Sequence, residues 1–519
     1  ARIGLDDFKT QEIIEIPNSA GNHASSFVTP NTEYVSAATR FSVPMDEELQ
    51  NMDVSIDSYK ENFHGTLSFI KVSDEGAMSV DFQIRMPGFN YDLSHSGKGP
   101  SDGWSFFTSY NSEQAHTLLE INASKNDKDY IAAVNWRKAA EYAAEGRGKM
   151  IPGEHYRNYI DHEEGGVAKS ELTEEVRVLD PRELEGLVYF LPTPKSPHGV
   201  DVDPSGQYIA AGGKLSTVIP VHSFEKIQQA IENEDFEGEE MGIPVLSYES
   251  ILHGEVQNPG LGPLHTEFDD RGNAYTTAFI SSEIVKWDVE TLEVTDRIDV
   301  YYSPGHLMIP GGDSQKPDGK YLVALNKITK DRYLPTGPEM FHSAQLIDIS
   351  GDKMELLLDF PTEGEPHYAQ GIAADKVMDN QKRFYEIADN AHPFVTQGEK
   401  EARVEREGNE VHVYMTTIRS HYAPDNIEGI KVGDEVYFHV TNLEQDWDVP
   451  HGFAVKGANN AELLIMPGET LTLKWEPKKV GVVPFYCTDF CSALHQEMSG
   501  YIRVSPPDSD VEISYGTGQ

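Results

Sequence analysis

The feature of this chain that most restricts its fold is a short unit that recurs in the middle of the sequence. In "SPHGVDVDPSGQYIAAGG" and "GPLHTEFDDRGNAYTTAF" a histidine stands ten residues before a tyrosine, and in "SPGHLMIPGGDSQKPDGKYLVAL" the spacing is fifteen. These histidines are His198, His265 and His306, and "GEPHYAQGIAA" repeats the opening of the unit at His367. Each unit reads as a loop containing proline and histidine, then a glycine turn, then a strand. Radial repetition of such units is typical of a β-propeller, whose loops converge near the central axis.

Most of the remaining sequence also predicts strands. Short alternating runs are broken by Gly, Pro, Asn and Asp, and only 128–146 and 223–238 have the pattern of exposed helices. The composition becomes strongly charged near 395–410, which indicates a linker, and the short strands that follow predict a small β-sandwich. We therefore expect an all-β protein with three parts. They are a β-propeller domain over 1–400, a sandwich domain over 401–506 and a loosely held tail over 507–519.

The charge of the chain excludes several partners. Its 86 acidic residues against 42 basic residues give a formal net charge of −44. This acidic excess argues against nucleic acid and against anionic membrane surfaces, and it favours a basic protein partner or a salty habitat. No apolar run approaches the roughly 20 residues needed to span a bilayer, so we expect no membrane insertion.

The stretch "CTDFCSALHQEM" holds both cysteines of the chain, Cys487 and Cys491, followed by His495 and Met498. Thiolate, imidazole and thioether are soft or borderline ligands, which suit copper or zinc. Zinc sites usually use C-x2-C pairs and do not recruit methionine, whereas two cysteines indicate two copper ions bridged by two thiolates. His451 in "DVPHGFAV", 36 residues before Cys487, is the candidate for a second histidine ligand. The alternative is that the cysteines are buried core thiols and the methionine fills the core.

This set resembles the binuclear CuA electron-transfer site of a cupredoxin domain, which occurs in nitrous oxide reductases and in subunit II of haem–copper oxidases. Asp489 stands where many nitrous oxide reductases have Trp and the oxidase subunit has Glu, and a backbone carbonyl ligand tolerates such a change. The resemblance implies these CuA ligands: His451, Cys487, the backbone carbonyl of Asp489, Cys491, His495 and Met498.

Over nearly its whole length the chain is similar to nitrous oxide reductases. The similarity is carried by "LGPLHTEFDDRGNAYTTAF", "DGKYLVALNKITKDRYLPTGP", "QLIDISGD" and "GEPH". The fold that this resemblance implies is a seven-bladed β-propeller followed by a cupredoxin-like β-sandwich.

In that family, seven histidines on the propeller axis hold a four-copper sulfide cluster called CuZ. Neutral imidazoles can bind copper from several loops without adding negative charge. For each histidine alone, the alternative is an ordinary hydrogen-bonded loop residue. The family's first two cluster histidines are adjacent, and this chain has no His-His pair, so we expect the sequence to begin about one blade late and to lack part of the cluster set. The positions that match are His23, His198, His265, His306 and His367.

Two further sets of residues follow from the resemblance. Lys327 in "LNKITKDR" matches a lysine at the edge of the cluster, where it would stabilise a bound oxygen or supply a proton. "SYNSEQAH" matches a calcium-binding segment, which implies Tyr110 and Glu113 as ligands, and Asp129 fits as a third oxygen donor. The family's Asn before "PHG" is Ser196 here, which leaves that ligand position open.

The function that the resemblance implies is the two-electron reduction of nitrous oxide to dinitrogen and water. Electrons would enter at CuA and pass to CuZ, from a small c-type cytochrome or a cupredoxin as donor. The family also implies a head-to-tail homodimer and a periplasmic location. Two other classes of function stay open on the sequence. One is a CuA electron-transfer protein related to the oxidase subunit with a non-catalytic propeller, and the other is a propeller scaffold that binds a protein or a sugar.

Overall fold

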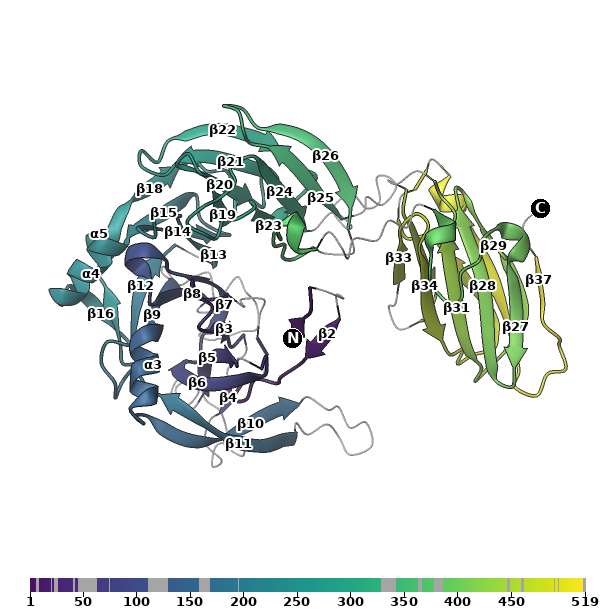
Figure 1. Ribbon diagram of the computed structural model, residues 1–519, viewed down its shortest axis with the longest axis horizontal. Helices are drawn as coiled ribbons and strands as arrows, with labels where there is room; N and C mark the ends of the chain where they lie inside the picture. The colour runs from purple at the N-terminus through teal and green to yellow at the C-terminus, as the bar shows by residue number, and fades with distance from the viewer. Residues whose placement is uncertain are drawn as a thin grey trace. The chain divides into compact units, whose positions relative to one another are not determined.

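The computed structural model of the chain consists mostly of strands and divides into two compact units (Figure 1). The first unit comprises Ala1–Lys327, Ala344–Asp359 and Pro366–Val377, and the second comprises Ile328–Ser343, Phe360–Glu365 and Met378–Gln519. Within the described part of the chain, no helix is both long enough and apolar enough to cross a membrane. The structure describes residues 1–5, 9–19, 21–22, 27–40, 43–44, 63–73, 75–110, 129–157, 169–194, 196–327, 342–362, 366–377, 386–445, 449–458, 462–489, 491–492 and 494–516.

Three four-stranded antiparallel sheets correspond to the repeated sequence unit, and in each the strands follow chain order. In Figure 1 these sheets are arranged around a common centre, with β13, β19 and β23 innermost. Each repeated histidine falls within the innermost strand of its sheet, and each repeated tyrosine falls within the next strand. The strands are β13 Pro197–Val202, β14 Tyr208–Gly213, β15 Val218–Ser223 and β18 Leu252–Gln257; β19 Pro263–Phe268, β20 Asn273–Ala278, β21 Glu283–Asp288 and β22 Val294–Asp299; and β23 Pro304–Met308, β24 Tyr321–Asn326, β25 Ser343–Asp348 and β26 Glu355–Pro361.

The turn after the first strand explains two residue types of the repeat. The carboxylate of Asp203 accepts hydrogen bonds from the backbone N–H groups of Gln207 and Tyr208, and Asp269 closes the turn of the next sheet in the same way. Gly206 and Gly272 stand inside these turns at φ +75° and +82°, a conformation that L side chains rarely adopt. The hairpin therefore needs both an acceptor side chain and a glycine.

Two larger sheets and one small sheet complete the first unit. Apolar side chains between the two larger sheets, among them Phe69, Phe82 and Phe190, form the largest hydrophobic cluster of this region. The strands are β1 Arg2–Ile3 and β2 Thr10–Glu12; β3 Val35–Ala38, β4 Val43–Pro44, β5 Phe63–Val72, β6 Met78–Pro87, β10 Lys149–Arg157 and β11 Lys169–Leu179; and β7 Asn90–Ser96, β8 Trp104–Tyr110, β9 Asp129–Asn135, β12 Val188–Thr193, β16 Phe236–Glu240 and β17 Ile243–Leu246.

The helices are shorter than the sequence pattern predicts. Residues 129–135 of the first predicted helix form β9, and α3 Trp136–Ala144 begins only after Asn135, whose side chain accepts from the Lys138 N–H as an N-cap. "DYIAAVN" is buried inside a sheet, so tertiary packing overrides its helical propensity. The second predicted helix is α4 Phe224–Glu232 and is followed by β16, while α5 Tyr248–Ile251 was not predicted.

The second unit is a sandwich of two mixed sheets. Side chains alternate along β28 and β31, and their buried members face the shared core, where Phe438, Phe453 and Phe485 contact one another. Burying each such ring is worth about 2–3 kcal/mol. The first sheet contains β27 Arg403–Glu407, β28 Glu410–Ile418, β29 His421–Ala423, β31 Glu435–Asn442 and β34 Thr470–Trp475; the second contains β30 Asn426–Lys431, β32 His451–Val455, β33 Glu462–Ile465, β35 Gly481–Tyr486, β36 Ser499–Ser505 and β37 Ser514–Gly516.

Two segments differ from the sequence expectation. The charged stretch predicted as a linker contains β27, which pairs with β28 and carries its charges on exposed or half-buried positions. The tail predicted to be loosely held contributes β37, which pairs with β30. Backbone pairing at a sheet edge does not need apolar side chains, so neither strand has a strong hydrophobic pattern.

Candidate metal centres

The repeated histidines of the first unit meet. His198, His265 and His306 belong to three different sheets, yet the ring centroids of His198 and His265 are 5.1 Å apart, and those of His265 and His306 are 5.0 Å apart. All three rings are buried or nearly so. Because a propeller brings its innermost strands to one axis, residues far apart in sequence become neighbours.

Threonine hydroxyls fix the backbone around these rings. Oγ1 of Thr108 on β8 donates to the carbonyl of His198 at 3.0 Å. Oγ1 of Thr277 accepts from the N–H of His265 and donates to the carbonyl of Gly305 in the next sheet. The threonines thus tie neighbouring sheets together at the level of the histidines.

His367 and Lys327 lie at the edge of the same group. Nζ of Lys327 is 3.4 Å from Nε2 of His367, and Tyr368 stacks on the ring of His306 with centroids 3.9 Å apart. A Cβ on Gly305 would lie 3.0 Å from the Lys327 side chain, so glycine leaves this lysine its space.

Burial keeps the imidazoles of His265 and His306 neutral. Burial and then the charges of His198 and His367 lower the pKa of His306 to about 3. Burial followed by the charges of His306 and His198 also places the pKa of His265 well below its usual range. A neutral imidazole nitrogen is the form that binds a metal, so the group is electrostatically prepared for ligation.

One carboxylate orients a histidine of this group. Asp92, 1% exposed, accepts a hydrogen bond from Nδ1 of His198 and one from Nη1 of Arg40. Because Nδ1 of His198 makes this bond, Nε2 is the nitrogen that would bind a metal.

Several predicted residues lie wholly or partly outside the described residues. His23 and Glu113 are not among them, and for Tyr110 only the backbone is described. Asp129 is described at the start of β9, where it is 6% exposed and its Oδ2 accepts from the N–H of Ser196 at 2.9 Å. Two of the predicted calcium positions, Asp129 and Ser196, are therefore neighbours. The side chains of the other two, Tyr110 and Glu113, lie outside the described residues.

In the second unit the cysteine loop folds back on itself. Sγ of Cys491 is 3.7 Å from Sδ of Met498 and 4.0 Å from Nδ1 of His495, and Sγ of Cys487 donates to the carbonyl of Asp489 at 3.2 Å. A ring nitrogen of His451 and the two Sγ atoms all lie within 4.8 Å of one another. The predicted soft ligands are thus brought together.

A hydrogen bond between the two thiols moves their pKa values apart. This bond and then burial raise the pKa of Cys487 to about 11, whereas the same bond lowers the pKa of Cys491 against the effect of burial. One of the two sulfurs is accordingly the better thiolate before any metal binds.

His451 is held from behind by Glu444. Nε2 of His451 is 3.2 Å from Oε1 of Glu444, which also accepts from the N–H and Nε of Arg419. Burial opposes ionisation of Glu444, but the hydrogen bonds from His451 and Arg419 lower its pKa to about 2. A Cβ on Gly452 would lie 2.0 Å from Oγ1 of Thr488, so this glycine lets the β32 strand approach the cysteine loop closely.

The donor set fits copper. Nδ1 of the fully buried His451 has no hydrogen-bond partner among the described residues, and a buried nitrogen of this kind is costly unless something binds it. Two thiolates, imidazoles, a thioether and a carbonyl around that nitrogen are the ligands that soft copper takes.

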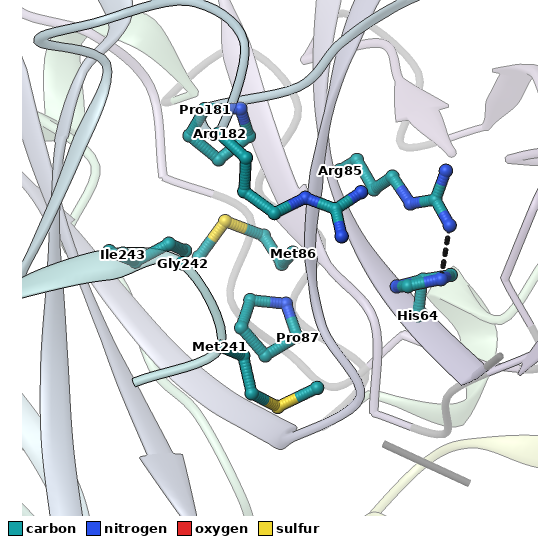
Figure 2. A pocket seen from close by; sticks show the side chains of 9 residues that line it. All are labelled: His64, Arg85, Met86, Pro87, Pro181, Arg182, Met241, Gly242 and Ile243. Carbon is teal, nitrogen blue, oxygen red and sulfur yellow. Dashed lines mark hydrogen bonds between the residues drawn. The ribbon is translucent and has the colours of Figure 1, made fainter. Parts of the chain in front are cut away.

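The first unit also contains a separate cavity. It has a volume of about 340 Å³, and the arginines Arg85 and Arg182 project into it beside His64, to which Arg85 donates (Figure 2). None of the described copper ligands lines it.

Comparison with known proteins agrees with these features. Residues 297–367, which include the four strands β23 to β26, match the family model of the nitrous oxide reductase propeller repeat. The chain is 32% identical to the nitrous-oxide reductase of Stutzerimonas stutzeri over 531 residues, covering 98% of this chain and 76% of that protein. It is 32% identical to the enzyme of Pseudomonas fluorescens, covering 97% and 75%. A part amounting to 20% of the chain is 36% identical to cytochrome c oxidase subunit 2 of Thermus thermophilus, of which it covers 73%.

A β-propeller joined to a cupredoxin-like sandwich with soft ligands defines a class of copper proteins. Within that class, the chain belongs to the nitrous-oxide reductase family. The predicted all-β fold and the predicted family are confirmed.

Sequence reasoning missed the supporting residues. Asp92, Tyr368 and Glu444 each contact a candidate ligand, but no spacing in the sequence singles them out. Only Tyr368, next to His367 in "EPHY", carries a local signal.

Proposed function

We propose that this protein reduces nitrous oxide with two electrons and two protons, giving dinitrogen and water. The observation that carries the proposal is the convergence of His198, His265 and His306 from three sheets, with ring centroids about 5 Å apart. Membership in the nitrous-oxide reductase family supports the same activity.

We infer two copper sites. The four-copper sulfide cluster would be held by His198, His265, His306 and His367, with His23 as a further ligand. The CuA site would be held by His451, Cys487, the carbonyl of Asp489, Cys491, His495 and Met498. Copper held by these residues would supply electron transfer in the second unit and reducing electrons for the substrate in the first.

The residues of the chain have separate roles around the substrate. Lys327 is the proposed catalytic residue, because its Nζ lies 3.4 Å from the ring of His367 and can donate to an oxygen held at that edge. Asp92 orients His198 through Nδ1, and Tyr368 packs against His306 and excludes water from that face of the ring.

Further parts of the proposal rest on family membership. They are a calcium ion bound by Tyr110, Glu113 and Asp129, a homodimer, a periplasmic location and a role in denitrification. A small c-type cytochrome or cupredoxin is the proposed donor. With −44 on this chain, a basic docking face on the donor is expected, and the association rate should fall as ionic strength rises.

Metal analysis of the protein as isolated tests the function. Copper well beyond two ions per chain, acid-labile sulfide and consumption of nitrous oxide with reduced viologen are expected. Two copper ions without sulfide would instead support the electron-transfer protein related to the oxidase subunit, whose likeness covers only 20% of the chain. Absence of copper would support a binding scaffold.

A further inference from the structure

The separate cavity of about 340 Å³ in the first unit lies where three segments of the chain meet. Its lining comes from β5 and β6, from the turn after β11 and from the hairpin of β16 and β17. β5 and β6 belong to one of the two larger sheets, whereas β16 and β17 belong to the other. A molecule bound in the cavity would therefore contact both sheets at once.

The polar part of the lining is basic. Among the described residues that line the cavity, the polar side chains are the guanidinium groups of Arg85 and Arg182 and the imidazole of His64, and none is a carboxylate. Both guanidinium groups point toward the side of the cavity on which His64 lies (Figure 2). In a chain with a formal net charge of −44, this lining is exceptional, and it favours an anion.

Arg85 is oriented by a neutral group. It donates from Nη2 to Nε2 of His64, whose side chain is buried. Because guanidinium nitrogens only donate, Nε2 of this imidazole is the accepting nitrogen and carries no proton. The contact thus fixes the direction of the guanidinium without opposing its charge.

Arg182 is held by a carboxylate that does not line the cavity. Oδ1 of Asp180 accepts from the N–H of Arg182 at 3.0 Å and from its Nε at 2.9 Å, and Oδ2 accepts from Nη2. Burial opposes ionisation of Asp180, but the hydrogen bonds from Arg182 and the charges of Arg182 and Arg85 lower its pKa. Nη1 of Arg182 has no hydrogen-bond partner in the described part of the chain, and the side chain is 43% exposed. Nη1 is therefore available to a ligand.

A glycine gives the Arg182 side chain its space. Gly242 stands in the turn between β16 and β17 at φ +82°, and a Cβ there would lie 2.8 Å from Cγ of Arg182. Any other residue would meet both the backbone strain of this conformation and the arginine. The hairpin turn is thus shaped to admit the arginine.

The remaining walls of the cavity are apolar. Met86 and Ile243 are each 1% exposed and belong to the hydrophobic cluster between the two larger sheets, and Met241 packs against that cluster. Pockets for small molecules usually combine apolar walls with a few polar groups that fix orientation, and their volumes begin at about 300 Å³. The cavity is accordingly large enough for an anion that carries a carbon body.

We propose that this cavity binds a small organic anion. The oxyanion head contacts Arg85 and Arg182, and the compact apolar body contacts the walls formed by Met86, Met241 and Ile243. Guanidinium groups form strong charge-assisted hydrogen bonds with carboxylate and phosphate oxygens, so both kinds of head suit the site. The inference is independent of the proposed function, because no described copper ligand lines the cavity.

Calorimetric titration of the full chain with benzoate tests the site, at an ionic strength held constant with potassium chloride. We expect saturable binding, and about fivefold or more weaker binding of acetate, which has the same head but lacks the ring. Phenylphosphonate, which keeps the ring and changes the head, distinguishes a carboxylate ligand from a phosphate one.

The matched comparison is Arg182→Gln against Arg137→Gln. Arg137 also pairs with an aspartate, Asp102, at 2.8 Å and is 45% exposed, but it does not line the cavity. Arg182→Gln should weaken benzoate binding about tenfold or more, whereas Arg137→Gln should leave it within about twofold of the wild type. Arg182→Lys, which keeps the charge, should restore part of the affinity.

A second measurement needs no variant. Crystals of the wild-type protein are soaked in 4-bromobenzoate, and the anomalous signal of bromine locates the ligand. We expect a bromine peak beside Met86 and Ile243, with the carboxylate on the two arginines. The proposal would be overturned if neither benzoate nor phenylphosphonate bound saturably, if Arg182→Gln kept the wild-type affinity, or if bromine appeared only outside the cavity.

Discussion

The two candidate metal centres are assembled in opposite ways. In the second unit, five of the six proposed ligands come from one stretch of twelve residues, 487–498, and only His451 comes from elsewhere, on β32. In the first unit, each described histidine comes from a different segment, spread over 198–367. One site is specified by a loop, whereas the other is specified by how the sheets surround their axis.

The electrostatics differ as well. Burial and neighbouring imidazoles lower the pKa of His265 and His306, so these rings are neutral without help. Burial also opposes the charged form of His451, but the neighbouring Cys487 and Glu444 raise its pKa. The loop site must lose a proton when it binds copper, and the axial site need not.

The largest expected effect is the loss of copper when a cysteine of the loop 487–498 is changed. Cys491→Ser should remove both copper ions of the second unit, because a bridging thiolate serves two metals at once, and should leave the copper of the first unit in place. Copper per chain and the visible spectrum measure this. Leu494→Ala, at an exposed position of the same loop, is the control. Loss of copper from both units together would contradict the independence of the two sites.

A substitution among the histidines of the first unit should remove only part of the copper bound there. His265→Ala removes one of several imidazoles, so the first unit should retain some copper but lose its native spectrum, while the spectrum of the second unit stays unchanged. Copper analysis and electron paramagnetic resonance distinguish the two units. If His265→Ala left the copper content and spectrum as in the wild type, the histidines would not share a metal site.

A smaller effect, on copper affinity, is expected when the carboxylate that orients His198 is changed. Asp92→Asn keeps the shape of the side chain but weakens its hold on Nδ1 of His198, and such changes typically cost about 10–100-fold in metal affinity. Competition with a copper chelator measures the affinity. Asp81→Asn removes a carboxylate that pairs with Lys71 at the surface and should have no such effect. Equal copper affinities for the two variants would show that Asp92 does not support the metal site.

The smallest expected effect is a change of stability with pH that comes from His439, a buried histidine that is not a proposed copper ligand. Burial and the charge of His412 lower the pKa of His439 to about 4, although no copper site is proposed there. Because the folded-state pKa lies below the unfolded value of about 6.5, stability is full above pH 6.5 and declines as pH falls toward 4. We expect the free energy of unfolding of the second unit to drop by about 1 kcal/mol between about pH 7 and pH 5.5.

Denaturant unfolding at the two pH values measures this drop. His439→Phe should reduce it and should leave copper binding intact. A variant that retained the whole pH dependence would assign the effect to other groups.

The contrast between a local loop site and a site assembled from several sheets also explains how much could be predicted from the sequence. The cysteine loop was readable because its ligands are local, and the histidine-bearing units were readable because the repeat marks the innermost strands. Asp92 and His198 lie 106 residues apart, and Glu444 meets Arg419 across 25 residues, so no spacing rule could pair them. Asp201 and Asp313 each lie 3.6 Å from a ring nitrogen of His95, and sequence spacing does not predict these contacts for the same reason.

Local propensity also failed where packing opposed it. "DYIAAVN" has helix-forming residues, but it forms β9 because two neighbouring strands cover it in the sheet. The charged stretch before the sandwich looks like a linker, but it forms β27 because backbone pairing with β28 requires no apolar pattern.

The two glycine turns described above are alike in motif but differ in mutational tolerance. Gly272 faces open space, so asparagine, which accepts a left-handed backbone, should replace it with little loss. A side chain on Gly206 would meet the carbonyl of Lys98 at 1.7 Å and displace the turn. In a directed-evolution library, identical codons would therefore be permissive in one hairpin and strongly destabilising in its neighbour.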